Sequence, residues 1–253
     1  MYAPERHAEI VMLARADGRV DVTALAARFD VATETIRRDL TALERRGLLR
    51  RVHGGAVALE RLPFEPTVVE RDAVHTAQKD AIAQAALAEI GDATTILIDG
   101  GTTTARLVQV LPTDRQLTVI TQAIPIANAL AQRDNVTLLV VGGTTRGTTL
   151  TNVGPWATSA ISTLTTDLAF LGTNGLTLER GLSTRDVAEA EVKRAITGAA
   201  RRVVVLADHS KIGHDELVTF AQLEAVDTIV TDAAVDAHLA SEIAAAGVEV
   251  VRA

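Results

Sequence analysis

The chain contains no cysteine, which excludes a disulfide framework and any zinc site built on cysteine ligands. Aromatic residues make up only 2% of its 253 residues, so the core must be built from Ala, Val, Leu and Ile. No apolar run approaches the roughly 18 residues that a membrane-spanning helix needs, and the opening MYAPERHAEI lacks the regions of a signal peptide. These absences predict a globular cytoplasmic protein of one or two domains, without a membrane partner.

The charge is unevenly distributed along the chain. The net charge of −7 argues at first sight against a nucleic-acid partner. Residues 1–57, however, carry ten Arg against eight acidic residues, and within residues 32–55 six Arg stand against three acids. One small basic module on an acidic chain is the distribution expected where that module contacts phosphates.

Three helices and a hairpin are predicted in this module. Apolar residues at helical spacing predict a helix over residues 5–16, a short helix after Asp21, and a longer Arg-bearing helix that begins near Thr33 or Glu34 and ends at Gly47. The following LLRRVHGGAVAL surrounds a glycine pair and predicts a two-stranded hairpin. This layout is typical of a winged helix-turn-helix, whose last helix enters the major groove of DNA.

Candidate DNA contacts lie on the third helix and on the hairpin. An Arg-rich amphipathic helix taken alone is more simply a solvated surface, but the preceding short helix and the following hairpin favour DNA binding. Side chains near the start of such a helix reach base edges: here Thr33, Thr35 and Arg37. Arginines beside them neutralise phosphates: here Arg38, Arg50 and Arg51.

A second domain is predicted after residues 60–75, which hold two prolines and mixed charge without a clean period. The predicted organisation is a winged module over 1–58, a linker over 59–74 and an α/β domain over 75–253. In that domain short apolar runs alternate with helical segments, which predicts parallel strands with crossover helices. The predicted strands are residues 95–98, 117–120, 136–141, 168–171, 203–207 and 228–231.

Small polar loops follow most of these predicted strands. After the first strand Gly100 and Gly101 allow a tight turn, and residues 102–104 present three threonines at a helix N-terminus, which suits a phosphate. A plain strand-to-helix turn with capping threonines fits this string equally well. The loops GGTTRG at 142–147 and ADHSK at 207–211 favour a binding site, because the carboxyl ends of strands in open α/β sheets converge on a ligand crevice.

The residues resemble the DeoR-type family of bacterial regulators. The strings that carry the resemblance are ERHAEI, GRVDVTALAARFDV and TETIRRDLTALERRGLLRRVHGGAV, and the loops of the second domain extend it over nearly the whole chain. It implies that operator DNA is bound by a region from about Val20 to His53, including His53. It further implies a mostly parallel α/β sensor domain similar to ribose-5-phosphate isomerase, and a phosphorylated sugar as effector. A homo-oligomer, dimer or tetramer, is expected on symmetry grounds.

The same resemblance predicts which residues bind the effector. Lys211, in a strand-end loop, is favoured over Lys193, which could instead pair with Glu189 on a helix surface. The family more often has Asn and Ser where this chain has Gln122 and Ala123. The predicted effector-binding residues are Asp99, Gly100, Gly101, Thr102, Thr103, Thr104, Thr121, Gln122, Gly142, Gly143, Lys193 and Lys211.

The competing hypothesis is a sugar-phosphate isomerase with a DNA-binding module. Proton transfer needs a carboxylate base, and the related isomerases carry an Asp-Glu pair where residues 173–175 read Thr-Asn-Gly. Consecutive residues 208–210, Asp-His-Ser, cannot align as a hydrolase triad, and His209 and His214 with Asp208 make only a weak metal cluster. The sequence thus favours a repressor of a sugar-metabolism operon, without catalytic residues, cofactor or metal. Resemblance to regulators of fructose operons makes fructose 1-phosphate the first candidate effector.

Overall fold

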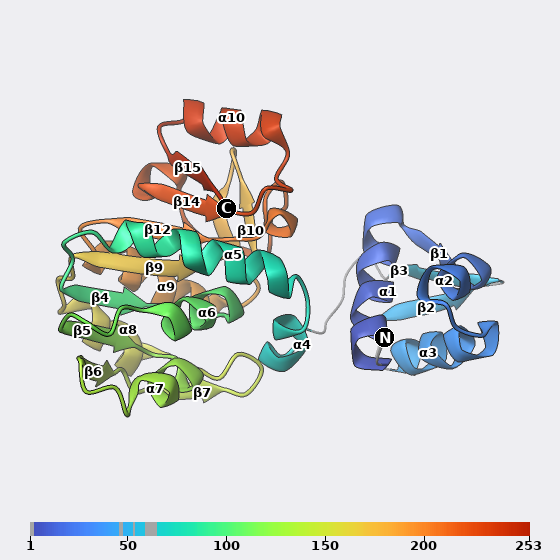
Figure 1. Ribbon diagram of the computed structural model, residues 1–253, viewed down its shortest axis with the longest axis horizontal. Helices are drawn as coiled ribbons and strands as arrows, with labels where there is room; N and C mark the ends of the chain where they lie inside the picture. Colours follow the sequence, from blue (N-terminus) through green and yellow to red (C-terminus); the bar gives the residue numbers. More distant parts are fainter. Residues whose placement is uncertain (1–2, 46–47, 53, 59–64) are drawn as a thin grey trace. The chain divides into compact units, whose positions relative to one another are not determined.

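The computed structural model describes residues 3–45, 48–52, 54–58 and 65–253 (Figure 1). The chain divides between Val74 and His75 into two compact units, which are described separately below. The segment expected to be a linker includes a short helix, α4 (Val68–Asp72), which Thr67 and Glu70 cap through a reciprocal capping box.

The N-terminal unit is a three-helix module with a three-stranded antiparallel sheet in the order β1-β3-β2. Asp21 caps the second helix by accepting hydrogen bonds from the backbone N–H groups of Thr23 and Ala24. The three predicted helices and the hairpin are present, whereas β1 was not predicted because three residues are too few to show an alternating pattern. The elements are α1 (Ala3–Asp17), β1 (Arg19–Asp21), α2 (Val22–Phe29), α3 (Thr33–Arg45), β2 (Leu49–Val52) and β3 (Gly55–Ala58).

The core of this unit is almost entirely aliphatic. Ile36, Leu40 and Leu43, the side chains of α3 expected to face inward, are all fully buried. They pack with residues of α1 and α2, including Ile10 and Phe29. This packing of one apolar helix stripe against its neighbours leaves the opposite face of α3 in solvent.

The C-terminal unit is built on a seven-stranded parallel sheet in the order β15-β14-β12-β9-β4-β5-β6. All six strands predicted for this sheet are present, and its edge strand β15 was not predicted. The strands are β4 (Thr95–Ile98), β5 (Leu117–Thr121), β6 (Val136–Val140), β9 (Leu168–Gly172), β12 (Val203–Leu206), β14 (Thr228–Thr231) and β15 (Glu249–Arg252).

Helices cover both faces of this sheet (Figure 1). Successive strand residues point to opposite faces, so Leu97 packs in one core whereas Ile96 and Ile98 pack in the other. One face carries α5 (Thr76–Ala86), which continues as the 3-10 turn η1 (Leu87–Ile90), with α6 (Thr102–Val110) and α7 (Ile124–Leu130). The other carries α8 (Pro155–Ser162), α9 (Val187–Ala199) and α10 (Ala237–Ala245).

The order of the strands places a topological switch point between β4 and β9. From β4 the chain moves to β5 and β6 on one side, and it returns to build β9, β12, β14 and β15 on the other. In open α/β sheets a crevice forms outside the carboxyl ends of the strands at such a point. The residues that follow β4 and β9 are therefore the first candidates for a ligand site.

Short antiparallel strands border this carboxyl edge, and none of them was predicted. The hairpin of β7 (Thr144–Arg146) and β8 (Thr151–Val153) follows β6. A three-stranded sheet is formed by β10 (Gly175–Thr177), β11 (Gly181–Thr184) and β13 (Val218–Ala221). The hairpin contributes Arg146 and Thr151, and the small sheet contributes Thr184, to the site described below.

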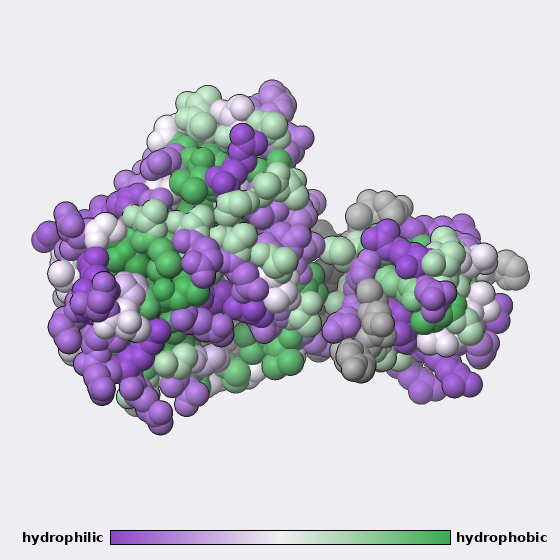
Figure 2. All heavy atoms as spheres, viewed as in Figure 1, coloured by the Kyte–Doolittle hydropathy of each residue, from purple (hydrophilic) through white to green (hydrophobic). Residues whose placement is uncertain are grey.

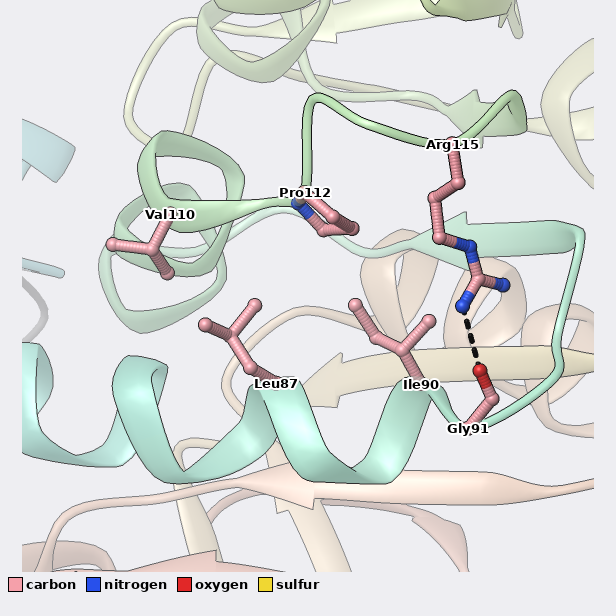
Figure 3. Close-up of a pocket in the computed structure, with 6 residues that line it drawn as sticks. All are labelled: Leu87, Ile90, Gly91, Val110, Pro112 and Arg115. Carbon is pink, nitrogen blue, oxygen red and sulfur yellow. Dashed lines mark hydrogen bonds between the residues drawn. The ribbon is translucent and has the colours of Figure 1, made fainter.

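An apolar groove of about 260 Å³ lies between η1 and the C-terminal end of α6. Figure 2 shows hydrophobic surface over this part of the unit, and Figure 3 shows Leu87, Ile90, Val110 and Pro112 facing one another. Arg115 is the charged residue in the lining of the groove, and its guanidinium donates a hydrogen bond to the carbonyl oxygen of Gly91. Its lining residues come just before β4 and β5 in the chain. The groove therefore lies at the amino ends of these strands, opposite their carboxyl ends, and is not the candidate ligand site.

Among the described residues, no helix is both long and apolar enough to cross a membrane. In the same part of the chain, no group of three or more His, Asp or Glu side chains is arranged to hold a metal ion.

Candidate functional site

The predicted base-contacting residues lie on the first two turns of α3. Thr33, Arg37 and Arg38 are exposed and Thr35 is half-buried. The guanidinium of Arg37 donates to the Glu34 carboxylate at 3.3 Å, a pair that is itself exposed. These side chains form a solvated face rich in hydrogen-bond donors, as a recognition helix requires.

The wing strand β2 is tied to α3 through Arg51. Its guanidinium donates to the Thr41 hydroxyl at 3.0 Å, and its backbone N–H donates to the Glu44 carboxylate at 2.9 Å. Arg50 is exposed on the same strand. The structure thus brings the two wing arginines beside the helix, while His53 lies outside the described residues.

A buried charge cluster beneath α3 was missed by the sequence analysis. Asp39 is 6% exposed and accepts hydrogen bonds from the Arg6 guanidinium at 2.6 Å and from His7 Nε2 at 2.8 Å. Burial alone would raise the pKa of Asp39, but the hydrogen bonds from Arg6 and His7 outweigh it and the pKa is lowered. This ionised carboxylate fixes α1 against α3.

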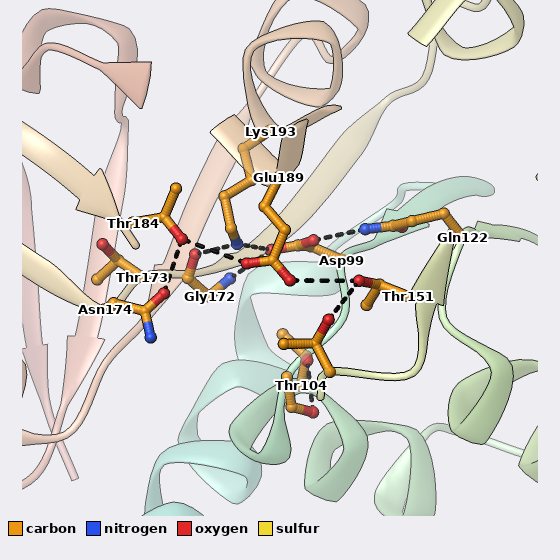
Figure 4. Close-up of polar contacts among 12 residues, drawn as sticks. Asp99, Thr104, Gln122, Thr151, Gly172, Thr173, Asn174, Thr184, Glu189 and Lys193 are labelled. Atoms are coloured by element: carbon orange, nitrogen blue, oxygen red, sulfur yellow. Dashed lines mark hydrogen bonds and ion pairs between the residues drawn. The ribbon is translucent and has the colours of Figure 1, made fainter. Parts of the chain in front are cut away.

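A second polar cluster lies at the switch point of the C-terminal unit (Figure 4). Asp99, at the end of β4, is 2% exposed and pairs with the ammonium group of Lys193. Asp99 Oδ1 accepts from Gln122 Nε2 at 2.6 Å, and Oδ2, the oxygen that pairs with Lys193, also accepts from the backbone N–H of Gly172 at 3.2 Å. Lys193 also donates to the carbonyl oxygen of Gly172 at 2.8 Å. We call Asp99, Gln122, Gly172 and Lys193 the Asp99 cluster.

Glu189 lies beside the Asp99 cluster and was not predicted as a site residue. It is 7% exposed and accepts from the Arg146 guanidinium at 2.7 Å, from Thr184 at 3.3 Å and from Thr151 at 3.4 Å. Burial would raise its pKa, yet Lys193, a hydrogen bond from Thr149 and Arg146 together lower it. The site therefore holds a second fixed carboxylate.

The amide of Gln122 is only half satisfied. Its Nε2 donates to Asp99, whereas its Oε1 is buried without a hydrogen-bond partner in the structure. An unsatisfied buried amide oxygen costs about 1–3 kcal/mol, and such groups need an explanation. A ligand whose hydroxyl or amine group donates a hydrogen bond to Gln122 Oε1 would supply that explanation.

The remaining predicted effector residues are distributed along the same edge. Thr102, Thr103 and Thr104 are buried at the start of α6, and Thr104 donates to the carbonyl oxygen of Gly101 at 3.0 Å. Thr121 is fully buried and accepts from the backbone N–H of Ala123. Gly142 and Gly143 lead into the β7–β8 hairpin, where a side chain on Gly143 would meet the carbonyl oxygen of Val153.

Comparison with known families identifies the family to which the chain belongs. A family model described as the DeoR-like helix-turn-helix domain matches residues 6–61, and one described as the DeoR C terminal sensor domain matches residues 74–233. The chain belongs to the DeoR family of transcriptional regulators.

Individual relatives align in sequence with this DeoR-family regulator over nearly their full lengths. The HTH-type transcriptional regulator GlpR of Haloferax volcanii is 39% identical over 99% of this chain and 98% of its own. The putative aga operon transcriptional repressor of Escherichia coli O157:H7 is 32% identical over 98% of this chain and 93% of its own. Ribose 5 phosphate isomerase A from Neisseria gonorrhoeae is 15% identical, with a TM-score of 0.39 over 56% of this chain and 54% of its own. That last similarity is too low to inform on ligand or reaction.

The alternative in which Lys193 sits on a helix surface is wrong for this DeoR-family regulator. Lys193 is 6% exposed and points into the sheet edge, because it lies one turn from Glu189 on the face of α9 that also carries buried Ile196. Glu189 could have been found by the same signal, an acidic residue on an otherwise apolar helix face. Lys211 instead lies in the turn after β12, and Asp208 interacts with it electrostatically.

Close packing at Gly100 makes the loop after β4 of this DeoR-family regulator sensitive to substitution. A Cβ at Gly100 would lie 2.1 Å from Thr151 Cγ2 and 3.3 Å from Ala123 Cβ, so the β7–β8 hairpin would have to move. We expect Gly100→Ala to destabilise the C-terminal unit by about 1–3 kcal/mol, measured by thermal unfolding followed by circular dichroism. Gly101→Ala is the matched control, since its Cβ meets only the Thr104 hydroxyl, at 3.1 Å, and a shift of a few tenths of an ångström relieves that contact. Equal losses in the two variants would contradict the packing argument.

Proposed function

We propose that this regulator represses a sugar-metabolism operon as a homo-oligomer and that a phosphorylated sugar releases it from operator DNA. The observation that carries the proposal is the buried Asp99 cluster at the switch point of a unit joined to a DNA-binding module. A carboxylate, an amide and an ammonium group are the polar groups that recognise hydroxyls and phosphate esters.

Support for operator binding comes from the solvated face of α3 and the wing. The proposed DNA-binding residues are Thr33, Thr35, Arg37, Arg38, Arg50, Arg51 and His53. Relatives are named as repressors, and one of them, the glycerol-3-phosphate regulon repressor of Escherichia coli K12, is 32% identical to this chain. An oligomer places two or more such modules on repeated half-sites, and sedimentation equilibrium measures its size.

Arg37 and Arg50 are expected to contribute to DNA binding in different ways. Arg37→Ala should cost about 1–3 kcal/mol of specific binding and relax the sequence preference, because Arg37 is placed to reach base edges. Arg50→Ala should weaken all sequences alike and reduce the salt dependence by about one ion, because it contacts phosphate. Fluorescence anisotropy at several salt concentrations measures both, with the exposed Arg180 of the other unit, changed to Ala, as the control. Unchanged binding in both variants would contradict the proposed surface.

The proposed effector is tested with the same anisotropy measurement. The chain is titrated onto DNA from upstream of its own gene with and without fructose 1-phosphate, glycerol 3-phosphate and other sugar phosphates. Release by one phosphate ester, and not by its free sugar, supports the proposal, with fructose 1-phosphate as the first candidate. Specific DNA binding that no ester alters would remove sugar phosphates as the effector class.

A second candidate function, sugar-phosphate isomerisation, is favoured by one observation, the buried carboxylate of Glu189. Its lowered pKa and its ion pair with Arg146 make it a weak base, because a general base works best with a pKa near the operating pH. The regulator should therefore not exchange substrate protons. Incubation with sugar phosphates in deuterated water, followed by proton NMR, tests this expectation, and deuterium incorporation next to the carbonyl would establish the enzyme.

A further inference from the structure

The two outermost strands of the seven-stranded sheet, β6 and β15, differ in how their outer sides are protected (Figure 1). β15 carries an exposed charged residue at each end, Glu249 and Arg252. Charges on an edge strand are a usual device against pairing with another chain. β6, with the sequence VTLLV, has neither charge nor proline, and its Leu139 and Val140 are 41% and 54% exposed. One outer strand is therefore protected against pairing, and the other is not.

The backbone of β6 can accept a further strand. β6 pairs in parallel with β5, and it has no second neighbour among the strands that the structure describes. The backbone N–H of Val141, the residue after β6, donates to the carbonyl oxygen of Thr121 on β5 at 2.9 Å. Backbone groups alternate in direction along a strand, so the N–H and C=O groups of Leu138 and Val140 point away from β5.

The helices beside β6 are uncharged as well. α7 packs against one face of the strand. On the other face Leu139 lies on the same side as Val141, which shares a core with Ala157 of α8. None of α7, β6 and α8 contains Asp, Glu, Lys or Arg, although such residues make up 23% of the chain. Within residues 135–166 the sequence has one charged residue, Arg146, and its guanidinium is paired inside the candidate site.

α8 presents an uncharged stripe to solvent. Trp156, Ser159 and Ala160 are exposed at helical spacing, and Trp156, the only tryptophan of the chain, is 82% exposed. Depletion of charge and enrichment of aromatic residues distinguish the centre of a protein–protein interface from the rest of a surface. We call the exposed apolar residues of these three elements the β6 patch: Ile124, Leu139, Val140, Trp156 and Ala160.

We propose that β6 pairs with β6 of a second copy of this chain, antiparallel about a two-fold axis, so that the two sheets join into one. A two-fold axis places each patch against the same patch of the other copy. A charged patch would then oppose like charges, whereas an uncharged one meets itself without repulsion. The charge pattern therefore favours a second copy over a partner with a charged surface.

The flanking helices belong to the same interface. A stable interface takes about 20–30 residues from each partner, which is more than the five residues of β6 supply. Pairing of the strands brings α7 of both copies together on one face of the joined sheet and α8, with Trp156, on the other. This inference rests on the homo-oligomer of the proposed function and names the surface that forms it.

The junction gives the regulator the symmetry that paired operator half-sites require. Each copy contributes one DNA-binding unit, and two linked units bind more tightly than either alone because the second contact becomes intramolecular. Loss of the junction should therefore weaken operator binding, although the β6 patch lies outside the DNA-binding unit.

The test measures the oligomer of the full-length chain by sedimentation velocity over a range of concentrations. Val140→Lys places like charges at the junction and should raise the dissociation constant by at least about 100-fold, which halves the mass of the largest species. Val140→Pro should do the same, because it removes an N–H that points away from β5, and proline is tolerated on edge strands. Leu217→Lys is the control, since it adds the same charge at a residue that is 74% exposed outside the β6 patch.

The fluorescence of Trp156 reports the same contact in the unaltered chain. Because the chain has a single tryptophan, its emission should shift to shorter wavelength as the copies associate and the indole leaves water. Val140→Lys should keep the long-wavelength emission of an exposed indole at the same concentrations. Leu217→Lys should shift as the unaltered chain does.

The outcomes separate this interface from the proposed function. If the unaltered chain stays a monomer, the homo-oligomer fails and the interface falls with it, and the patch is left to a partner of another kind. If the chain is an oligomer whose mass both Val140 variants retain, the interface is overturned while the oligomer stands. Circular dichroism shows whether these variants are folded. If neither is, the unaltered chain decides, and association without a shift in Trp156 emission overturns the interface.

Discussion

Replacing Asp39 by alanine is expected to unfold the N-terminal unit and abolish DNA binding. The substitution leaves the Arg6 guanidinium, 7% exposed, without its carboxylate. Removing one partner of a buried ion pair typically costs about 3–5 kcal/mol. Units of roughly 60 residues are only marginally stable, so a loss of this size reaches or exceeds the stability that the unit has.

Hydrogen exchange of the full-length chain, read by mass spectrometry, measures this effect in each unit separately. Peptides from the helices α1 to α3 should lose protection in Asp39→Ala, while peptides from residues 75–253 keep theirs. Glu34→Ala removes an exposed carboxylate from the same helix and should cost less than about 1 kcal/mol. Arg6→Met combined with Asp39→Leu should recover stability because both charges are gone. Equal protection in the Asp39 and Glu34 variants would contradict the buried ion pair.

Lys193→Met is expected to produce a loss of similar size in the C-terminal unit. It leaves Asp99 buried with hydrogen bonds from Gln122 and Gly172 only, and it removes a charge that holds Glu189 ionised. The expected cost is about 3–5 kcal/mol without ligand, because Asp99 and Glu189 are only 2% and 7% exposed. This loss of stability is measured by urea unfolding of the full-length chain, with hydrogen exchange of α6 and α9 as the readout for the C-terminal unit.

Two variants make this second prediction specific. Arg194→Met changes the adjacent residue, whose side chain is 41% exposed and pairs with Glu191, and should cost no more than about 1 kcal/mol. Asp99→Asn in the Lys193→Met background should restore part of the loss, because it removes the charge that was left unpaired. A double variant no more stable than Lys193→Met would show that the loss comes from the cation–π contact with Phe220, from whose ring centroid the Lys193 ammonium lies 5.3 Å.

Periodicity was sufficient to predict the main elements of the fold. The apolar stripe of α3 and the six apolar runs that became strands are local signals, which a window of ten residues contains. The strand β1 and the small sheet of β10, β11 and β13 were missed because segments such as GLT and GLST hold a single large apolar residue and show neither an apolar run nor an alternating pattern. Their positions are set by pairing with distant segments, as Leu182 pairs with Ala221.

Most of the candidate site was predicted from residues in loops at strand ends, and Lys193, on α9, was predicted from the family resemblance. Asp99 and Gln122 follow strands, so their position on the carboxyl edge could be inferred from topology. Arg146 and Glu189 are 43 residues apart and meet only because the β7–β8 hairpin folds back over the sheet. Asp39 was not singled out in the sequence, since nothing local shows that Arg6 lies opposite it. Contacts of this kind depend on tertiary structure and leave no periodic signal.

The scarcity of lysine has a chemical consequence. Residues 1–74 contain no lysine, so apart from the terminal amine every primary amine of the chain lies in the C-terminal unit, at the edge where the strands end. Acylating reagents, including reactive acyl metabolites, therefore act on that edge and leave the guanidinium groups of α3 and the wing unmodified. Half-buried Lys211 should react faster than buried Lys79 and Lys193, so its acylation rate gives a covalent footprint of whatever occupies the crevice.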